Sequence, residues 1–273
     1  MPELDLNGVT VAYEDSGPPV GAPDAPTVVF GHGLLFSGWM FRPQVEALSK
    51  DYRCVTIDWR GQGKTRPVRH ADYEMDSLYA DAVGLIEHLG VGPVHYVGLS
   101  MGGFVGQRIG ARRGELLRTL TLLDTSPDRE QLRAAIEDIA MAAIYRAGGI
   151  GLLRGAVAKI MFGPTFRADA NRKPMIDEFF ERVDRTDRAG LRRAIVAVAT
   201  RKPVYAELDR ITVPTLVVTG ADDKPTPPAK ARRIAERVPG ARLEIVPDCG
   251  HSSTVEQPEI ITRLIQEFLA AAN

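Results

Sequence analysis

The chain has 273 residues, of which 44% are hydrophobic and 25% are charged, a composition typical of a globular protein with one large core. Its formal net charge of -1 gives no electrostatic footprint for nucleic acid or an anionic membrane, and no apolar run approaches the ~18 residues of a membrane-spanning helix. The first residues lack the basic and apolar regions of a secretory signal, and Cys54 and Cys249 are the only cysteines, so we expect a cytoplasmic protein with two reduced thiols.

The first half of the chain alternates short apolar runs with segments of helical periodicity. The Asn7-Gly8 pair between two alternating runs predicts a β-hairpin, because Asn-Gly supplies the positive φ angles of a type I′ turn. After a loop rich in Pro and Gly over residues 16–26, continuous apolar runs predict strands that are buried on both faces. The predicted strands are 27–30, 53–57, 94–97 and 120–123, and the predicted helices are 41–49, 75–89 and one that begins near 103.

The pattern changes between residues 126 and 206. Ala, Arg and Leu dominate there, no β-branched run appears, and Gly148-Gly149 and Gly163-Pro164 interrupt the segment. We therefore expect three or four helices and no strand. Alternation then resumes, with predicted strands at 214–218 and 242–246 and predicted helices at 228–238 and 257–271.

This order of elements predicts an α/β fold with a parallel sheet and helices on both faces. We expect a core domain of residues 1–125 and 207–273 and a helical cap domain of residues 126–206. Ligands of such sheets bind beyond the carboxyl ends of the strands. The inserted helices leave the core at that edge, so we expect them to roof the binding crevice.

The segment Gly98-Leu99-Ser100-Met101-Gly102 joins a predicted strand directly to a predicted helix. A serine at such a sharp turn needs a strained backbone, and the two flanking glycines remove the Cβ atoms that would collide. This is the G-x-S-x-G nucleophile elbow in its strand–turn–helix context. Ser100 is therefore the candidate nucleophile, although a serine that only caps the helix would give the same local pattern.

A serine nucleophile requires a base, and the chain has five histidines. His251 follows the last predicted strand and shares the crevice edge with Ser100. His32 follows an earlier strand, and we interpret it as support for the loop that carries Leu34. Of the remaining histidines, we expect His70 to be solvated in a loop, His88 to be solvated on a helix and His95 to be packed in a strand.

The acid of the triad should follow a strand between the serine and the base. Gly220-Ala221-Asp222-Asp223 lies there, which gives the chain order Ser, Asp, His. Adjacent side chains point in different directions, so only one of the two aspartates can meet the ring of His251. The oxyanion requires two N–H donors, for which we predict the backbone of Met101 and of Leu34.

These motifs, together with His32-Gly33-Leu34-Leu35 and Asp58-Trp59-Arg60-Gly61-Gln62-Gly63, resemble the α/β-hydrolase superfamily over nearly the whole chain apart from the insertion. The resemblance implies the α/β-hydrolase fold, a mostly parallel eight-stranded sheet with helices on both faces and a helical cap insertion. In that family the acid usually stands three residues after the glycine, which favours Asp223 over Asp222.

The resemblance also separates branches of the superfamily. Haloalkane dehalogenases and epoxide hydrolases carry aspartate at the elbow, where this chain has Ser100. Carbon–carbon hydrolases often carry Trp after the histidine, where Ser252 stands here. The segments 98–103 and 223–228 look like those of 3-oxoadipate enol-lactonases and small esterases, while the family's usual Asp-Arg-Gly-His-Gly-Ser turn is altered at Gln62 and Lys64.

The leading hypothesis is a serine hydrolase that cleaves a small carboxylic ester or lactone, needs no cofactor or metal, and is a monomer or homodimer without nucleic-acid or membrane partners. The alternatives are a cofactor-free perhydrolase of the haloperoxidase kind, a carbon–carbon hydrolase, and a hydrolase-like small-molecule receptor. Candidate pocket residues, each of which could instead pack in the core or the cap, are Phe36, Trp39, Met141, Tyr145, Phe162 and Phe166.

Overall fold

The computed structural model describes residues 2–67 and 72–272 of the chain. Its strands form one sheet in the order β1-β2-β4-β3-β5-β6-β7-β8. β1 pairs antiparallel with β2, and β2 pairs antiparallel with β4, whereas every further pairing is parallel. The strands are β1 (Glu3–Leu6), β2 (Val9–Asp15), β3 (Thr27–Gly31), β4 (Arg53–Ile57), β5 (Val94–Leu99), β6 (Leu117–Leu123), β7 (Thr215–Gly220) and β8 (Arg242–Val246). The predicted mostly parallel, eight-stranded sheet is confirmed.

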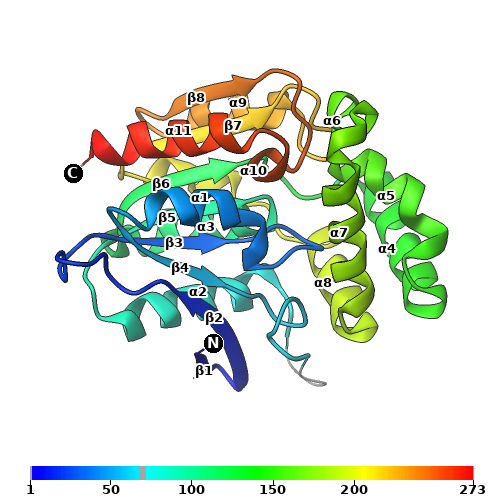
Figure 1. Cartoon of the computed structure of the whole chain (residues 1–273), viewed down its shortest axis with the longest axis horizontal. Helices are drawn as coiled ribbons and strands as arrows, with labels where there is room; N and C mark the ends of the chain where they lie inside the picture. Colours follow the sequence, from blue (N-terminus) through cyan, green and yellow to red (C-terminus); the bar gives the residue numbers. More distant parts are fainter. Residues whose placement is uncertain (1, 68–71, 273) are drawn as a thin grey trace.

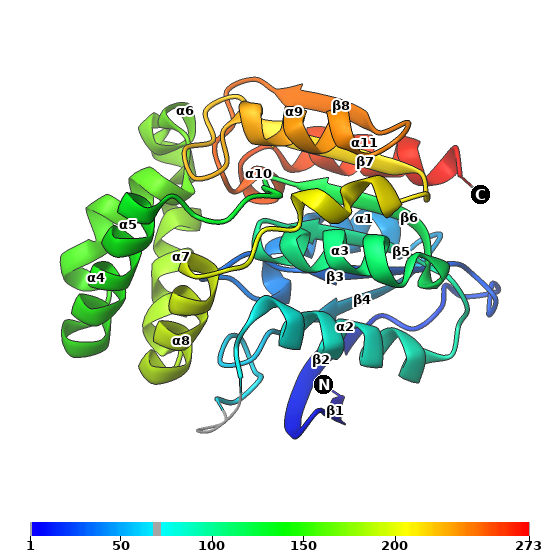
Figure 2. The same cartoon turned by 180° about the vertical axis from the view of Figure 1, so that it is seen from behind.

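Helices cover both faces of the sheet. One face carries α1 and α11, in front of the sheet in Figure 1, and the other carries α2, α3 and α9, in front of it in Figure 2. The central strands are therefore buried throughout, as the apolar sequence of β3 predicts. The helices of this part are α1 (Arg42–Leu48), α2 (Met75–Leu89), α3 (Met101–Arg112), α9 (Pro228–Arg237), α10 (Ser253–Glu256) and α11 (Pro258–Ala270).

Local sequence signals place several of these elements. Asn7 and Gly8 have φ angles of 50° and 79°, as the predicted hairpin turn requires. Helix α2 begins and ends where its apolar periodicity predicts, and Gly90 ends it in the left-handed conformation with φ of 61°. The short helix α10, which follows the loop of His251, was not predicted, because four residues carry no periodicity.

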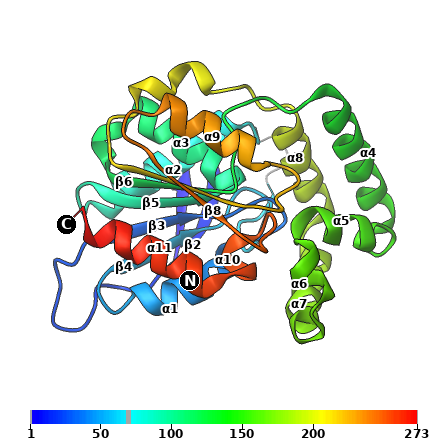
Figure 3. The same ribbon diagram turned by 90° about the horizontal axis from the view of Figure 1, so that it is seen from above.

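The segment 126–206 contains helices and no strand, as predicted, but it has five α-helices rather than three or four. The difference arises because the helices on either side of Gly163 are only eight and five residues long. So few residues show no clear helical periodicity. In Figure 3 these helices lie beyond the ends of the strands, on one side of the sheet. They are α4 (Leu132–Gly148), α5 (Arg154–Met161), α6 (Pro164–Ala168), α7 (Lys173–Arg185) and α8 (Arg188–Ala199). Within the ranges described, no helix is long and apolar enough to cross a membrane.

Two glycines let the backbone of α3 approach the sheet closely. A Cβ atom on Gly102 would lie 1.9 Å from the carbonyl oxygen of Gly31 in β3. A Cβ atom on Gly98 would lie 2.4 Å from the carbonyl oxygen of Gly102. Backbone atoms cannot move away from such contacts cheaply, so both positions require glycine. The start of α3 is thereby fixed against the carboxyl ends of β3 and β5.

Candidate active site

Ser100 lies at the turn from β5 to α3 with φ of 50° and ψ of −107°, a conformation that costs energy for any residue with a side chain. Hydrogen bonds on every side hold it there. Its N–H donates to the Leu123 oxygen at 2.8 Å, and its carbonyl accepts from the Phe104 N–H and the Thr125 hydroxyl, each at 2.9 Å. These contacts therefore fix the backbone conformation of Ser100 and the direction of its Cα–Cβ bond.

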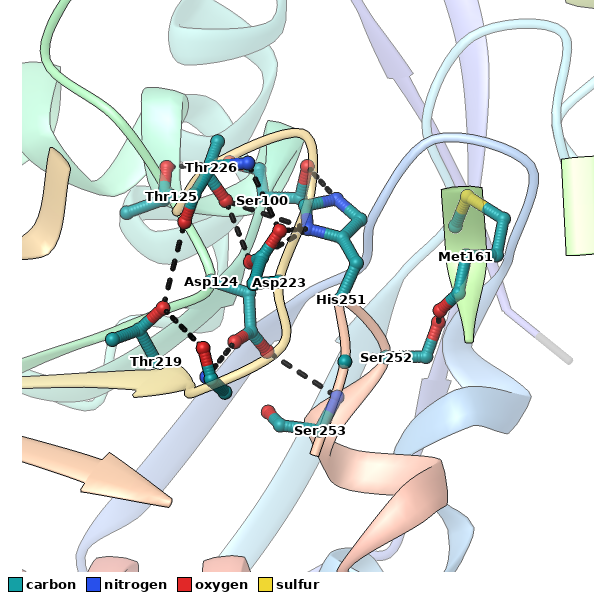
Figure 4. A network of polar contacts seen from close by, with 12 residues as sticks. Ser100, Asp124, Thr125, Met161, Thr219, Asp223, Thr226, His251, Ser252 and Ser253 are labelled. Carbon is teal, nitrogen blue, oxygen red and sulfur yellow. Dashed lines mark hydrogen bonds and ion pairs between the residues drawn. The ribbon is translucent and has the colours of Figure 1, made fainter. Parts of the chain in front are cut away.

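The three residues predicted to form a triad lie in one hydrogen-bonded row (Figure 4). The Oγ of Ser100 is 3.0 Å from Nε2 of His251. The Nδ1 of His251 is 3.0 and 2.9 Å from the two carboxylate oxygens of Asp223. All three side chains are buried, although they come from the ends of β5, β7 and β8.

Asp223, and not Asp222, faces the imidazole. Its carboxylate also accepts hydrogen bonds from the N–H of Thr226 at 2.9 Å and from the hydroxyl of Thr226 at 2.8 Å. Asp222 is half-buried, and its carboxylate forms no hydrogen bond with any of the described residues. Thr226 thus orients the aspartate that meets the ring, a role that the sequence reasoning missed.

Buried carboxylates surround the imidazole. Burial by itself lowers the pKa of His251, but the charge and hydrogen bond of Asp223, with Asp124 and Glu256, raise that pKa above its ordinary value. Asp124 follows β6 and accepts hydrogen bonds from the Gly220 and Ser253 N–H groups. Burial and then the charge of Asp223 raise the pKa of Asp124 to about 8.

The two backbone groups predicted to bind an oxyanion are the N–H groups of Leu34 and Met101. Neither the Leu34 N–H nor the Met101 N–H donates to any described residue. The loop of Leu34 is held in place through the next residue. Leu35, with φ of 70°, donates its N–H to Oε1 of Gln62 at 2.9 Å. Gln62, at the altered position of the predicted turn, therefore fixes this loop.

His32 supports the same loop and does not reach Ser100. Its Nδ1 lies 2.7 Å from the Gly33 oxygen, and its Nε2 accepts from the Trp59 N–H at 3.0 Å. Burial lowers the pKa of His32 to about 3, so the ring stays neutral. Of the other histidines, His95 is buried and bonded to Thr119, His88 is exposed on α2, and His70 lies outside the described residues.

A cavity of about 130 Å³ adjoins Ser100 and His251. Core residues such as Leu34 and Phe104 line one side, and residues of the helical segment such as Ile150 and Met161 line the other. Arg201, Glu130 and Asp138 also line the cavity and form a charged cluster that the sequence did not predict. Arg201 donates to Glu130 at 2.9 Å, and burial, followed by the charge of Glu130, raises the pKa of Asp138 to about 6.

The six residues proposed for the pocket divide into two groups. Met141 and Tyr145 line the cavity. The other four do not line this cavity: Phe36, Trp39, Phe162 and Phe166. Phe36 and Trp39 line a separate pocket instead. Phe36 and Phe162 pack on the ring of Phe179 at 4.9 and 5.3 Å, Phe166 stacks on Phe162, and Trp39 lies 4.8 Å from the guanidinium of Arg182. Their rings join the core to the helical segment.

Neither cysteine is placed as a nucleophile. Cys54 and Cys249 are both buried and unpaired. Burial raises the pKa of the Cys54 thiol to about 12 and also raises the pKa of Cys249, with nearby carboxylates such as Asp124 adding to the effect. The thiolate, which is the reactive form, is therefore disfavoured at both positions.

A strained serine on a strand–helix turn, at the carboxyl edge of a mostly parallel sheet and in contact with a buried histidine, defines an enzyme of the hydrolase class. The chain belongs to the α/β-hydrolase-fold family, whose model matches residues 26–258.

Individual relatives cover nearly the whole chain. A Stutzerimonas stutzeri protein provisionally named carbamate hydrolase RutD is 28% identical over 250 residues, 91% of this chain and 93% of the relative. A Mycobacterium tuberculosis protein provisionally named non-heme bromoperoxidase BpoC is 30% identical, over 96% and 98% of the two chains. Among solved structures, the enol-lactonase from Burkholderia xenovorans has a TM-score of 0.89 at 27% identity, over 98% and 100%.

Proposed function

We propose that the protein is a serine hydrolase that cleaves a small carboxylic ester or lactone through an acyl-enzyme. The observation that carries this proposal is the unbroken row from the Ser100 hydroxyl through His251 to the carboxylate of Asp223, with contacts of 2.9 to 3.0 Å. The similarity to an enol-lactonase supports ester chemistry, because a lactone is a cyclic ester.

The geometry suits each step of acyl transfer. The Oγ of Ser100 attacks the carbonyl carbon while Nε2 of His251 accepts the hydroxyl proton. Asp223 holds the ring by Nδ1 and stabilises the imidazolium. The free N–H groups of Leu34 and Met101 bind the tetrahedral oxyanion. His251 then protonates the leaving alcohol, and later deprotonates the water that hydrolyses the acyl-enzyme.

We further propose that residues 126–206 act as a cap that shapes the acyl pocket. Helix α4 contributes Met141 and Tyr145 to the cavity, and α5 contributes residues such as Val157. The cavity is small and mostly apolar, which favours a short apolar acyl group. Arg201 and Asp138 contribute hydrogen-bonding groups to the same cavity.

The size of the cavity predicts the acyl-chain preference. We expect p-nitrophenyl acetate and butyrate to be hydrolysed with higher kcat/KM than the octanoate, because about 130 Å³ holds a short chain more readily than a long one. Met141→Trp should lower kcat/KM for the butyrate more than for the acetate. Ile144→Trp, on the exposed side of the same helix, is the matched control and should leave the ratio unchanged. A preference for the octanoate would contradict the proposed pocket.

The charge around His251 predicts the pH dependence. Only the neutral imidazole can accept the serine proton, and the pKa of His251 is raised. Activity should therefore be lost as the pH falls through a value above the ordinary imidazole pKa of about 6.5. Initial rates from pH 5 to 9 test this, and a midpoint below the ordinary value would refute it.

A second candidate function is perhydrolysis, in which peroxide replaces water on the same acyl-enzyme. The similarity to the protein named as a bromoperoxidase favours it. Measuring hydrolysis and peracid formation with one acyl donor and added peroxide separates the two functions. Peracid formation that outpaces hydrolysis would assign the site to perhydrolysis, and hydrolysis alone would leave the esterase proposal.

A further inference from the structure

The carboxylate of Glu256 contacts the backbone on both sides of His251, and the proposed steps of acyl transfer do not use it. Glu256 is the last residue of α10 and is 2% exposed. Its Oε2 accepts from the Gly250 N–H at 2.9 Å and from the Gly163 N–H at 2.8 Å, and its Oε1 accepts from the Ser252 N–H at 3.0 Å. One buried carboxylate therefore accepts three backbone hydrogen bonds, each of which is strengthened by its charge.

The three donors belong to two parts of the chain. Gly250 and Ser252 are the neighbours of His251, whereas Gly163 lies between α5 and α6 of the helical segment. A second bond joins the same parts, from the Ser252 hydroxyl to the Met161 oxygen at 2.7 Å (Figure 4). The backbones also touch, since a Cβ atom on Gly250 would lie 2.2 Å from the Gly163 nitrogen. The loop of the histidine and the helical segment thus meet at Glu256.

We propose that Glu256 is a positioning residue. Its carboxylate acts as a clamp, because it links the backbone on both sides of His251 to Gly163 of the helical segment, so that the base is aligned with Ser100 only while these hydrogen bonds are intact. This rests on the proposed function, because it takes His251 as the base. Loss of the clamp frees two N–H groups beside His251 and one in the segment. A displacement of the base by about 1 Å can lower a rate by 10²-fold.

The negative charge of Glu256 should also affect the pKa of His251, which can be measured. Burial raises the pKa of Glu256, and the hydrogen bonds from Gly163, Gly250 and Ser252 oppose that rise. The charged groups that face His251 are Asp223 after β7, Asp124 after β6 and Glu256 on α10. All three raise the pKa of the imidazole. Removing the charge at position 256 should therefore lower the pKa of His251.

The test compares Glu256→Gln and Glu256→Ala with Glu259→Gln, the same charge change on an exposed neighbour. Gln keeps the shape and one acceptor oxygen, so we expect a moderate fall in kcat and a shift of the acid limb of the pH profile to lower pH. Ala removes every acceptor, and kcat should fall by about 10²-fold with KM little changed. The Glu259 variant should behave as wild type.

Two further readouts do not depend on ester turnover. The NMR titration of the His251 imidazole should move to lower pH in Glu256→Gln, and the Gly163 amide should exchange faster with solvent in Glu256→Ala. Wild-type kcat with an unmoved titration in folded Glu256→Gln would overturn the clamp. If Glu256→Ala does not fold, Glu256→Gln alone decides. Absence of Ser100-dependent turnover in the wild type would instead refute the proposed function, while the titration still tests the clamp.

Discussion

Replacing Ser100 by alanine is expected to lower kcat on p-nitrophenyl butyrate by roughly 10⁴- to 10⁶-fold, because the oxygen that attacks the carbonyl is removed. The residual rate would come from substrate binding and the oxyanion donors at Leu34 and Met101. Initial rates measured with purified wild type and variant, corrected for spontaneous hydrolysis, give the ratio directly.

The fold should survive this change. Alanine is no more strained than serine at φ of 50°, and the backbone hydrogen bonds of residue 100 to Leu123 and Phe104 remain. An unchanged melting temperature and circular dichroism spectrum are the controls. A variant that folds and retains more than a trace of turnover would assign the hydrolysis to another group and refute the proposed mechanism.

Replacing Asp223 by asparagine is expected to cost about 10⁴-fold in kcat, although the side chain keeps its shape. The N–H of Thr226 would hold the amide oxygen and leave the amide NH₂ facing Nδ1 of His251. The ring would then carry its proton on Nε2, where it cannot accept the proton of Ser100. The kinetic measurement is the same as for the serine variant.

Asp222→Asn is the matched control, because it makes the same substitution one residue away, where the carboxylate does not contact His251. We expect its kcat to remain close to that of the wild type. A larger loss in Asp222→Asn than in Asp223→Asn would reverse the assignment of the acid. Equal and small losses would show that the imidazole does not depend on either carboxylate.

The sequence predicted those parts of the site that depend on chain order and on short-range backbone geometry. Gly98 and Gly102 mark a sharp strand-to-helix turn at Ser100, and strand ends in a parallel sheet must meet at one edge. The choice between Asp222 and Asp223 could be made only by resemblance, because two adjacent aspartates have the same local signature.

The supporting residues could not be predicted, because their roles depend on long-range contacts. Glu256 acts through Gly163, which is 93 positions away, and Gln62 acts through Leu35. The aromatic residues show the converse problem. Phe36 lies near a motif and Phe162 lies in the predicted cap, yet their rings pack against Phe179 rather than line the cavity. No single-residue pattern distinguishes a packed aromatic ring from one that lines a pocket.

The order of the site residues along the chain has a consequence for how activity arises during folding. Leu34 and Ser100 precede the helical segment, whereas Asp223, His251 and Glu256 follow it. The proposed nucleophile, Ser100, is therefore synthesised well before its proposed base, His251, and the two meet only after β7 and β8 have joined the sheet. Parallel pairing between distant strands is slow because chain entropy must be lost first. On the proposed mechanism, a nascent or partly refolded chain carries an inert serine, and the appearance of activity reports completion of the sheet.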